Sequence, residues 1–277
     1  MSPMTQDSDS SSSSVKELNR MTLPSLKVWP IIATVGLIMF AFMGLVVFIA
    51  LPAHLIFRAR PTLETMSSMT YIYLGHTGML LAALFWIALL SHGRFHEFGL
   101  KLPPNARYIR IALIFGILFG IVMKAVDYSE NFATHEPPEA VSSSPTQVAG
   151  HLAFEGFYAG TVEEILFRGL LMTFLVQRMS GRAHFGKFDL HVGGVIVAVL
   201  FAIVHMTSFW TDTFRLAAAQ QAYAFLWGIA YAYWREKSGS LLPSIVGHNV
   251  GNFVADVLTY LVPWLWSQKE VTDGAMI

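Results

Sequence analysis

Three apolar stretches of the sequence contain side chains suited to acid–base chemistry. The first places two adjacent carboxylates, Glu163 and Glu164, and a guanidinium, Arg168, inside a long hydrophobic run. Residues four apart share a helical face, so Glu164 and Arg168 can form an ion pair, whereas Glu163 is rotated by about 100°. An ion pair that serves only helix packing explains Glu164 and Arg168 equally well. Glu163 would add repulsion to such a pair, which favours a role as general base.

Two later runs offer imidazole and carboxamide groups. Phe201 and His205 lie one turn apart, and so do His248 and Asn252. A histidine near a helix end is often solvated, but beside Glu163 it would hold and deprotonate a water or bind a metal. His248 and Asn252 both donate hydrogen bonds, which suits the stabilisation of an oxyanion. An interhelical hydrogen-bond pair is the structural alternative.

The composition indicates a membrane protein. Hydrophobic residues make up 54% of the 277 residues, charged residues 13%, and the mean hydropathy is +0.52. The net charge is zero, which gives no reason to expect a nucleic acid partner. The sequence contains no cysteine, so disulfides and a cysteine nucleophile are excluded.

Apolar runs of spanning length predict an all-α fold, a polytopic transmembrane bundle of about seven or eight helices. Residues 1–27 form a polar tail predicted to be disordered. Residues 28–266 form a single transmembrane domain with a catalytic core at about 150–260, and residues 267–277 form a short tail. The predicted spans are 29–51, 70–91, 108–126, 150–178, 190–209, 213–234 and 241–266.

The distribution of basic residues predicts the orientation, because cytoplasmic loops are enriched in lysine and arginine. The N-terminus would therefore be cytoplasmic and the acidic segment 127–149 would face outward. Arg58 and Arg60 are an exception in the first outer loop. The residues predicted to be cytoplasmic are Lys16, Arg20, Lys27, Arg94, Lys101, Arg107, Arg110, Arg178, Arg182, Lys187, Arg235 and Lys237.

The three polar patterns resemble those of the CPBP intramembrane proteases, which include type II CAAX prenyl endopeptidases and bacteriocin-processing or immunity-associated Abi proteins. The family pattern is EExxxR, FxxxH and HxxxN/D on successive helices. Here it reads Glu163-Glu164 to Arg168, Phe201 to His205, and His248 to Asn252, in that order. The resemblance covers about residues 150–260.

The resemblance implies hydrolysis of a peptide bond in a membrane-associated protein, prenylated CAAX-type substrates included. Glu163 would be the general base and His205 its partner on the water. Glu164 and Arg168 would orient the site, while His248 and Asn252 would stabilise the oxyanion. The family has been described both with and without a metal. We expect no cofactor, although zinc held by Glu163, His205 and His248 stays open.

Two other functions use the same features. A proton-coupled transporter also contains buried glutamate and histidine, although no inverted repeat is evident. A non-catalytic scaffold or immunity protein is the second alternative. For His76, Glu155 and Asp256 we favour helix contacts over chemistry. We expect membrane lipid as a partner and a bacterial plasma membrane as the location; the oligomeric state cannot be read from the sequence.

Overall fold

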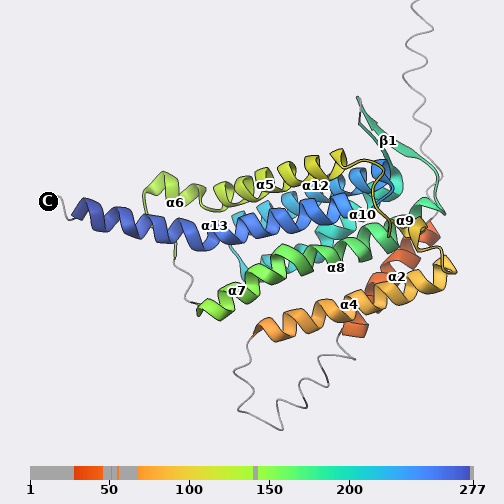
Figure 1. Ribbon diagram of the computed structural model, residues 1–277, viewed down its shortest axis with the longest axis horizontal. Coiled ribbons are helices and arrows are strands. Elements are labelled where there is room, and N and C mark those ends of the chain that lie inside the picture. Colours follow the sequence, from red (N-terminus) through yellow and green to blue (C-terminus); the bar gives the residue numbers. More distant parts are fainter. Residues whose placement is uncertain are drawn as a thin grey trace, which may run out of the picture.

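Long helices running side by side form most of the molecule (Figure 1). The computed structural model describes residues 28–45, 51, 55, 68–139, 143–186 and 188–274. The elements are α2 (Val28–Leu45), α4 (Ser68–Ser91), η3 (Phe95–Phe98), α5 (Arg107–Asp127), α6 (Ser129–Thr134), α7 (Pro145–Ala153), η4 (Phe154–Ala159), α8 (Gly160–Glu164), η5 (Ile165–Leu171), α9 (Met172–Val176), β1 (Arg182–Phe185), β2 (Phe188–His191), α10 (Val192–Val204), η6 (His205–Thr207), α11 (Ser208–Thr211), α12 (Phe214–Ser238) and α13 (Leu242–Gly274).

The predicted helical membrane bundle is confirmed. Three helical segments are long and apolar enough to cross a membrane, Ile72–Ser91, Arg107–Asp127 and Val192–Thr211, and Val28–Gly44 is apolar but shorter. Two of the other long helical segments contain motif residues that lower their hydropathy: Glu163, Glu164 and Arg168 lie within residues 145–176, and His248 and Asn252 lie on α13. The predicted disordered tail, residues 1–27, lies outside the described residues, as do Arg58, Arg60 and Lys187.

A continuous helix from residue 145 to residue 176 contains the first polar motif. It begins with a capping box, in which Ser144 Oγ accepts from the Gln147 N–H and the Gln147 side chain accepts from the Ser144 N–H. Two π-helical segments, η4 and η5, flank the short α8 that ends with Glu163 and Glu164. Such π-segments often occur at functional sites because they change which face a side chain occupies.

Glycines allow α13 to pack closely against α5. A Cβ at Gly116 would lie 2.6 Å from the carbonyl oxygen of Gly247, and a Cβ at Gly120 would lie 2.6 Å from that of Gly251. On each helix the two glycines are four residues apart, Gly116 and Gly120 on α5 and Gly247 and Gly251 on α13. This spacing lets helix backbones approach closely within a membrane. This packing fixes the helix that contains His248 and Asn252.

A β-hairpin follows α9, in the segment between the predicted spans 150–178 and 190–209. Strand β1 pairs antiparallel with β2, with Arg182 opposite His191. Arg182 donates to Asp189 Oδ1 over 2.7 Å and also pairs with Glu236 at the end of α12. The hydrogen bond from Arg182 holds the pKa of the Asp189 carboxyl below its usual range. These ionic contacts connect the hairpin to the bundle.

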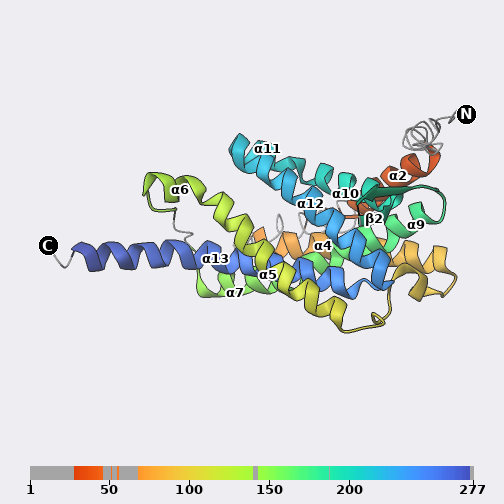
Figure 2. The ribbon, with the colours of Figure 1, turned by 90° about the horizontal axis from the view of Figure 1, so that it is seen from above.

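Three connections contain most of the described lysine and arginine residues: those between α4 and α5, α9 and α10, and α12 and α13. They meet at one end of the bundle, here called the basic end, where the hairpin lies (Figures 1 and 2). Arg235 donates to the Glu97 carbonyl over 2.9 Å, and the Tyr108 hydroxyl donates to the Lys237 carbonyl over 3.2 Å. The opposite end, here called the acidic end, contains α6, α11 and the C-terminal part of α13. The cytoplasmic location of the basic end stays a prediction.

Candidate active site

Glu164 and Arg168 form a fully buried ion pair, as their spacing predicted. Arg168 Nη1 donates to Glu164 Oε1 over 2.8 Å, and both side chains have 0% relative exposure. Arg168 Nη2 donates to the Gly228 carbonyl of α12 over 3.2 Å. The guanidinium also lies 4.4 Å from the centroid of the Phe201 ring of α10. Arg168 therefore connects the motif helix to both neighbouring helices.

His248 lies between the two glutamates. Its Nδ1 donates to Glu164 Oε1 over 2.9 Å, and its Nε2 is 3.7 Å from Glu163 Oε2. The imidazole stacks on the Tyr231 ring, with centroids 5.0 Å apart and planes inclined by 14°. The Phe201 ring meets it edge to face at 5.8 Å. The ring is thus held on both sides while Nε2 faces Glu163.

The close approach that brings His248 to Glu163 depends on Gly160. A Cβ at Gly160 would lie 2.5 Å from Asn249 Oδ1 and 2.8 Å from His248 Cγ. Asn249 itself donates to the Thr161 hydroxyl over 3.0 Å, which connects α13 to α8 beside this contact. The absence of a side chain at residue 160 therefore sets the separation of the two helices at the site.

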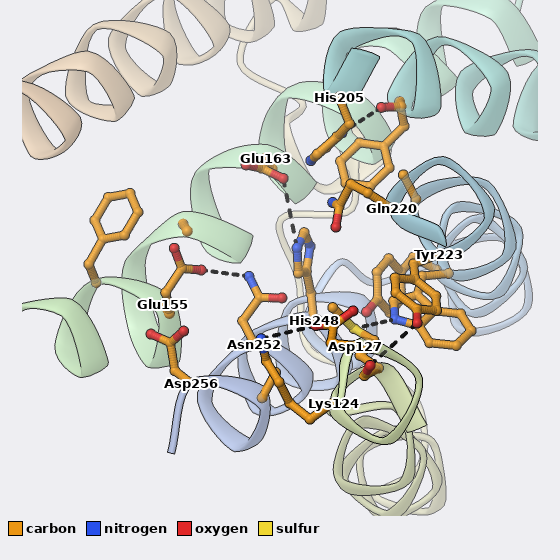
Figure 3. Close-up of a pocket in the computed structure, with 18 of the residues that line it drawn as sticks. Lys124, Asp127, Glu155, Glu163, His205, Gln220, Tyr223, His248, Asn252 and Asp256 are labelled. Carbon is orange, nitrogen blue, oxygen red and sulfur yellow. Dashed lines mark hydrogen bonds and ion pairs between the residues drawn. The ribbon is translucent and has the colours of Figure 1, made fainter. Parts of the chain in front are cut away.

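Glu163 points into a cavity, which His205, His248 and Asn252 also line (Figure 3). Its Oε1 lies 3.5 Å from Nε2 of His76, which belongs to α4. His76 Nδ1 donates to the Ile72 carbonyl over 3.0 Å, which fixes the orientation of the ring. The sequence favoured a simple helix contact for His76, and its position beside Glu163 was missed. The available signal was an ionisable residue within a membrane span, which is commonly functional.

His205 presents one nitrogen to the same cavity. Its Nδ1 donates to the Phe201 carbonyl over 2.7 Å, since a carbonyl oxygen only accepts. In the neutral ring Nε2 is then the unprotonated nitrogen, the form that accepts a proton from water. The Gln221 side chain donates to the His205 carbonyl over 2.9 Å and holds the backbone at this helix end.

Asn252 lines the cavity with His248, but one of its amide hydrogens is engaged. Asn252 Nδ2 donates to Glu155 Oε2 over 2.8 Å. The second N–H of the same amide is the donor left for a substrate. One helical turn further along α13, Asp256 accepts from His151 of α7. Glu155 and Asp256, for which we favoured helix contacts, do make such contacts and also line the cavity.

The cavity has a volume of about 380 Å³. Five of its polar lining residues come from four different helical segments, so their convergence depends on tertiary packing. Those five are His76, Glu163, His205, His248 and Asn252. Glu164 and Arg168 lie behind this wall, where they position His248.

The donor set does not form a ready metal site. Among the described residues, no three histidine, cysteine, aspartate or glutamate side chains are grouped closely enough to hold a metal ion. Glu163, His205 and His248 share one cavity, yet Glu163 and His205 form no direct contact.

The arrangement can perform water-dependent acid–base chemistry. A carboxylate and an imidazole face the same space, so together they can orient and deprotonate a water. Hydrogen-bond donors on α13 lie across from them, where a developing negative charge can be stabilised.

Comparison with protein families agrees with this chemistry. Residues 145–254 match the family model described as type II CAAX prenyl endopeptidase Rce1-like. The match includes every residue of the three motifs. Neither the curated proteins nor the solved structures gave a match.

Proposed function

Through residues 145–254 the chain belongs to the Rce1-like family of CAAX proteases, and on that premise we propose an endopeptidase that uses Glu163 to activate water inside the membrane. The observation that supports this role most strongly is the contrast between the two adjacent glutamates. Glu164 is fully buried and paired with Arg168, whereas Glu163 points into the cavity toward His76 and His248. One carboxylate is structural and the other is available for chemistry.

The reaction begins with a water held between Glu163 and the Nε2 of His205. Glu163 takes a proton from the water as the water oxygen attacks the scissile carbonyl carbon. The carbonyl oxygen becomes an oxyanion, which accepts a hydrogen bond from the free N–H of Asn252. His248 adds an Nε2–H donor in its protonated form, because its Nδ1–H already donates to Glu164. Loss of one such donor costs about 10²- to 10³-fold in rate.

Collapse of the tetrahedral intermediate breaks the carbon–nitrogen bond. The proton held by Glu163 passes to the leaving amine, which departs as a neutral amine, and the carboxylate is regenerated. His76 Nε2, 3.5 Å from Glu163 Oε1, orients this carboxylate when the ring is protonated, because Nδ1–H already donates to the Ile72 carbonyl. Arg168 and Glu164 act only through His248, so they are positioning residues.

The substrate is a membrane-associated peptide or protein. The enzyme is located in the plasma membrane of a bacterial cell. Zinc assistance is the alternative form of the same hydrolysis. A non-catalytic scaffold or immunity protein of the same fold is the alternative function; it would keep its cellular effect without cleaving any peptide.

Comparative proteomics of membrane peptides tests the proposal. Cells expressing the wild type, Glu163→Gln and the control Glu97→Gln are compared, with each protein checked for membrane insertion and thermal unfolding. Glu97 is a matched control because it pairs with Arg94 at the surface of the basic end. We expect cleavage products in the wild type and in Glu97→Gln and their loss in Glu163→Gln.

Equal product formation by folded Glu163→Gln would refute the proposal. Adding a chelator to purified wild-type protein addresses zinc separately. Unchanged activity supports the metal-free form, whereas loss of activity that zinc restores supports the alternative.

A further inference from the structure

The candidate cavity and the basic connections lie at opposite ends of the bundle. Among the described residues, the lysines and arginines toward the acidic end are Lys124, Arg215 and Lys269, and Arg168 lies inside the bundle. The other described lysines and arginines lie around the ends where α4 meets α5, α9 meets α10, and α12 meets α13. Such a bias places the basic end in the cytoplasm.

The cavity extends from the candidate site toward the acidic end. Beyond Glu163 and His248 it is lined by Lys124 and Asp127 at the end of α5 and by Gln220 near the start of α12. A second cavity, of about 580 Å³, shares His205, Gln220, Lys124 and Asp127 with the first. It continues between α6 and α11, where exposed side chains line it.

Packing closes the route toward the basic end. The Leu241 N–H donates to the Gly99 carbonyl over 2.9 Å, and the Ser244 hydroxyl donates to the Tyr231 carbonyl over 2.8 Å. Phe98 and Leu241 are each only 1% exposed. Within the described residues, none of the arginines or lysines of the basic end lines either cavity.

The charges along the cavities disfavour a free carboxylate. The lysine and the arginine among their described lining residues are already paired, Lys124 with Asp127 at 3.1 Å and Arg215 with Glu130 at 3.6 Å. Arg215 also donates to the Val126 carbonyl at the end of α5. Carboxylates outnumber these cations; they are Asp127, Glu130, Glu139, Glu155, Glu163, Asp212 and Asp256.

We propose that the enzyme takes its substrate from the face of the membrane opposite the cytoplasm, as a neutral or positively charged peptide segment. This inference rests on the proposed peptidase function and specifies its substrate class. Proteins confined to the cytoplasm, prenylated ones included, are then not its substrates. A segment with a free C-terminal carboxylate would meet a path along which carboxylates outnumber the described lysine and arginine, both of which are already paired.

Cysteine labelling tests the sidedness without requiring activity. The chain has no cysteine, so each introduced thiol is unique. Glu136→Cys reports the acidic end and Ala106→Cys the basic end; both residues are exposed and neither lines a cavity. In spheroplasts, a membrane-impermeant maleimide should label Glu136→Cys at once and Ala106→Cys only after permeabilisation. The opposite labelling would overturn the proposal.

Blocking the mouth tests the entry route. Asp212 lines the second cavity and is exposed, so a bulky impermeant maleimide on Asp212→Cys should reduce cleavage in spheroplasts at least tenfold relative to the same unlabelled variant. The same reagent should leave Ala106→Cys activity unchanged. Full activity of labelled Asp212→Cys would show that substrate enters elsewhere. Absence of cleavage in the wild type would instead count against the peptidase function. The labelling of Glu136→Cys and Ala106→Cys would still report which end of the bundle faces the outside.

Charge preference is tested with a cleaved substrate once one is identified. Replacing its lysines and arginines near the scissile bond with glutamine should lower kcat/KM about tenfold at low salt, since an acidic cleft concentrates cations. A higher kcat/KM after replacement with glutamate would contradict the proposed substrate class.

Discussion

Substitution of Gly160 by alanine should impair catalysis by moving His248 rather than by removing a reactive group. The new Cβ would lie 2.8 Å from His248 Cγ and 2.5 Å from Asn249 Oδ1. Ordinary contacts begin near 3.4 Å, so the ring must retreat by about 0.6 Å and the Asn249 oxygen by about 0.9 Å. Displacements approaching 1 Å at a catalytic group can cost about 10²-fold. We expect kcat/KM to fall by about 10- to 100-fold.

The matched control is Gly150→Ala in the same continuous helix. A Cβ at Gly150 meets nothing within 4 Å, so this variant should keep wild-type activity. Peptide cleavage by purified protein and thermal unfolding are measured for both. Gly160→Ala should destabilise by about 1–3 kcal/mol through overpacking. Wild-type kcat/KM in folded Gly160→Ala would refute the argument that this close approach positions His248.

Two further changes test ion pairs of the fold, one buried behind the site and one on the hairpin. Arg168→Met leaves the fully buried Glu164 carboxylate without its cationic partner and should destabilise the protein by about 3–5 kcal/mol; an unchanged unfolding temperature would contradict this. Asp189 has a pKa held low by Arg182, so its stabilisation is present above the unfolded value of about 3.9 and is lost as the pH falls through the lower folded value. Thermal unfolding between pH 3 and 7 should show this acid-dependent loss in the wild type and a smaller loss in Asp189→Asn, and identical profiles would contradict it.

Periodicity predicted the contacts that form within one helix. The four-residue spacing of Glu164 and Arg168 correctly predicted their ion pair, and the hydrophobic runs correctly predicted the helices around them. The adjacent Glu163 was predicted to find another partner because of its rotation, and it does so. These results follow from backbone geometry alone.

Contacts between helices were less predictable. The approach of His76 to Glu163 and the bond between Asn252 and Glu155 join residues that are 87 and 97 positions apart, and a single sequence gives no measure of such proximity. The π-helical segments and the hairpin were missed for a different reason. Both depend on tertiary packing and ionic contacts rather than on a distinct local composition.

The central claim is that Glu163 performs chemistry while its neighbour Glu164 supports the structure. The most direct test measures peptide cleavage and thermal unfolding for Glu163→Gln and Glu164→Gln in parallel. We predict that Glu163→Gln unfolds near the wild-type temperature and loses cleavage by at least 10²-fold, whereas Glu164→Gln unfolds at a clearly lower temperature. Substantial cleavage by folded Glu163→Gln would contradict the assignment of Glu163 as the catalytic base.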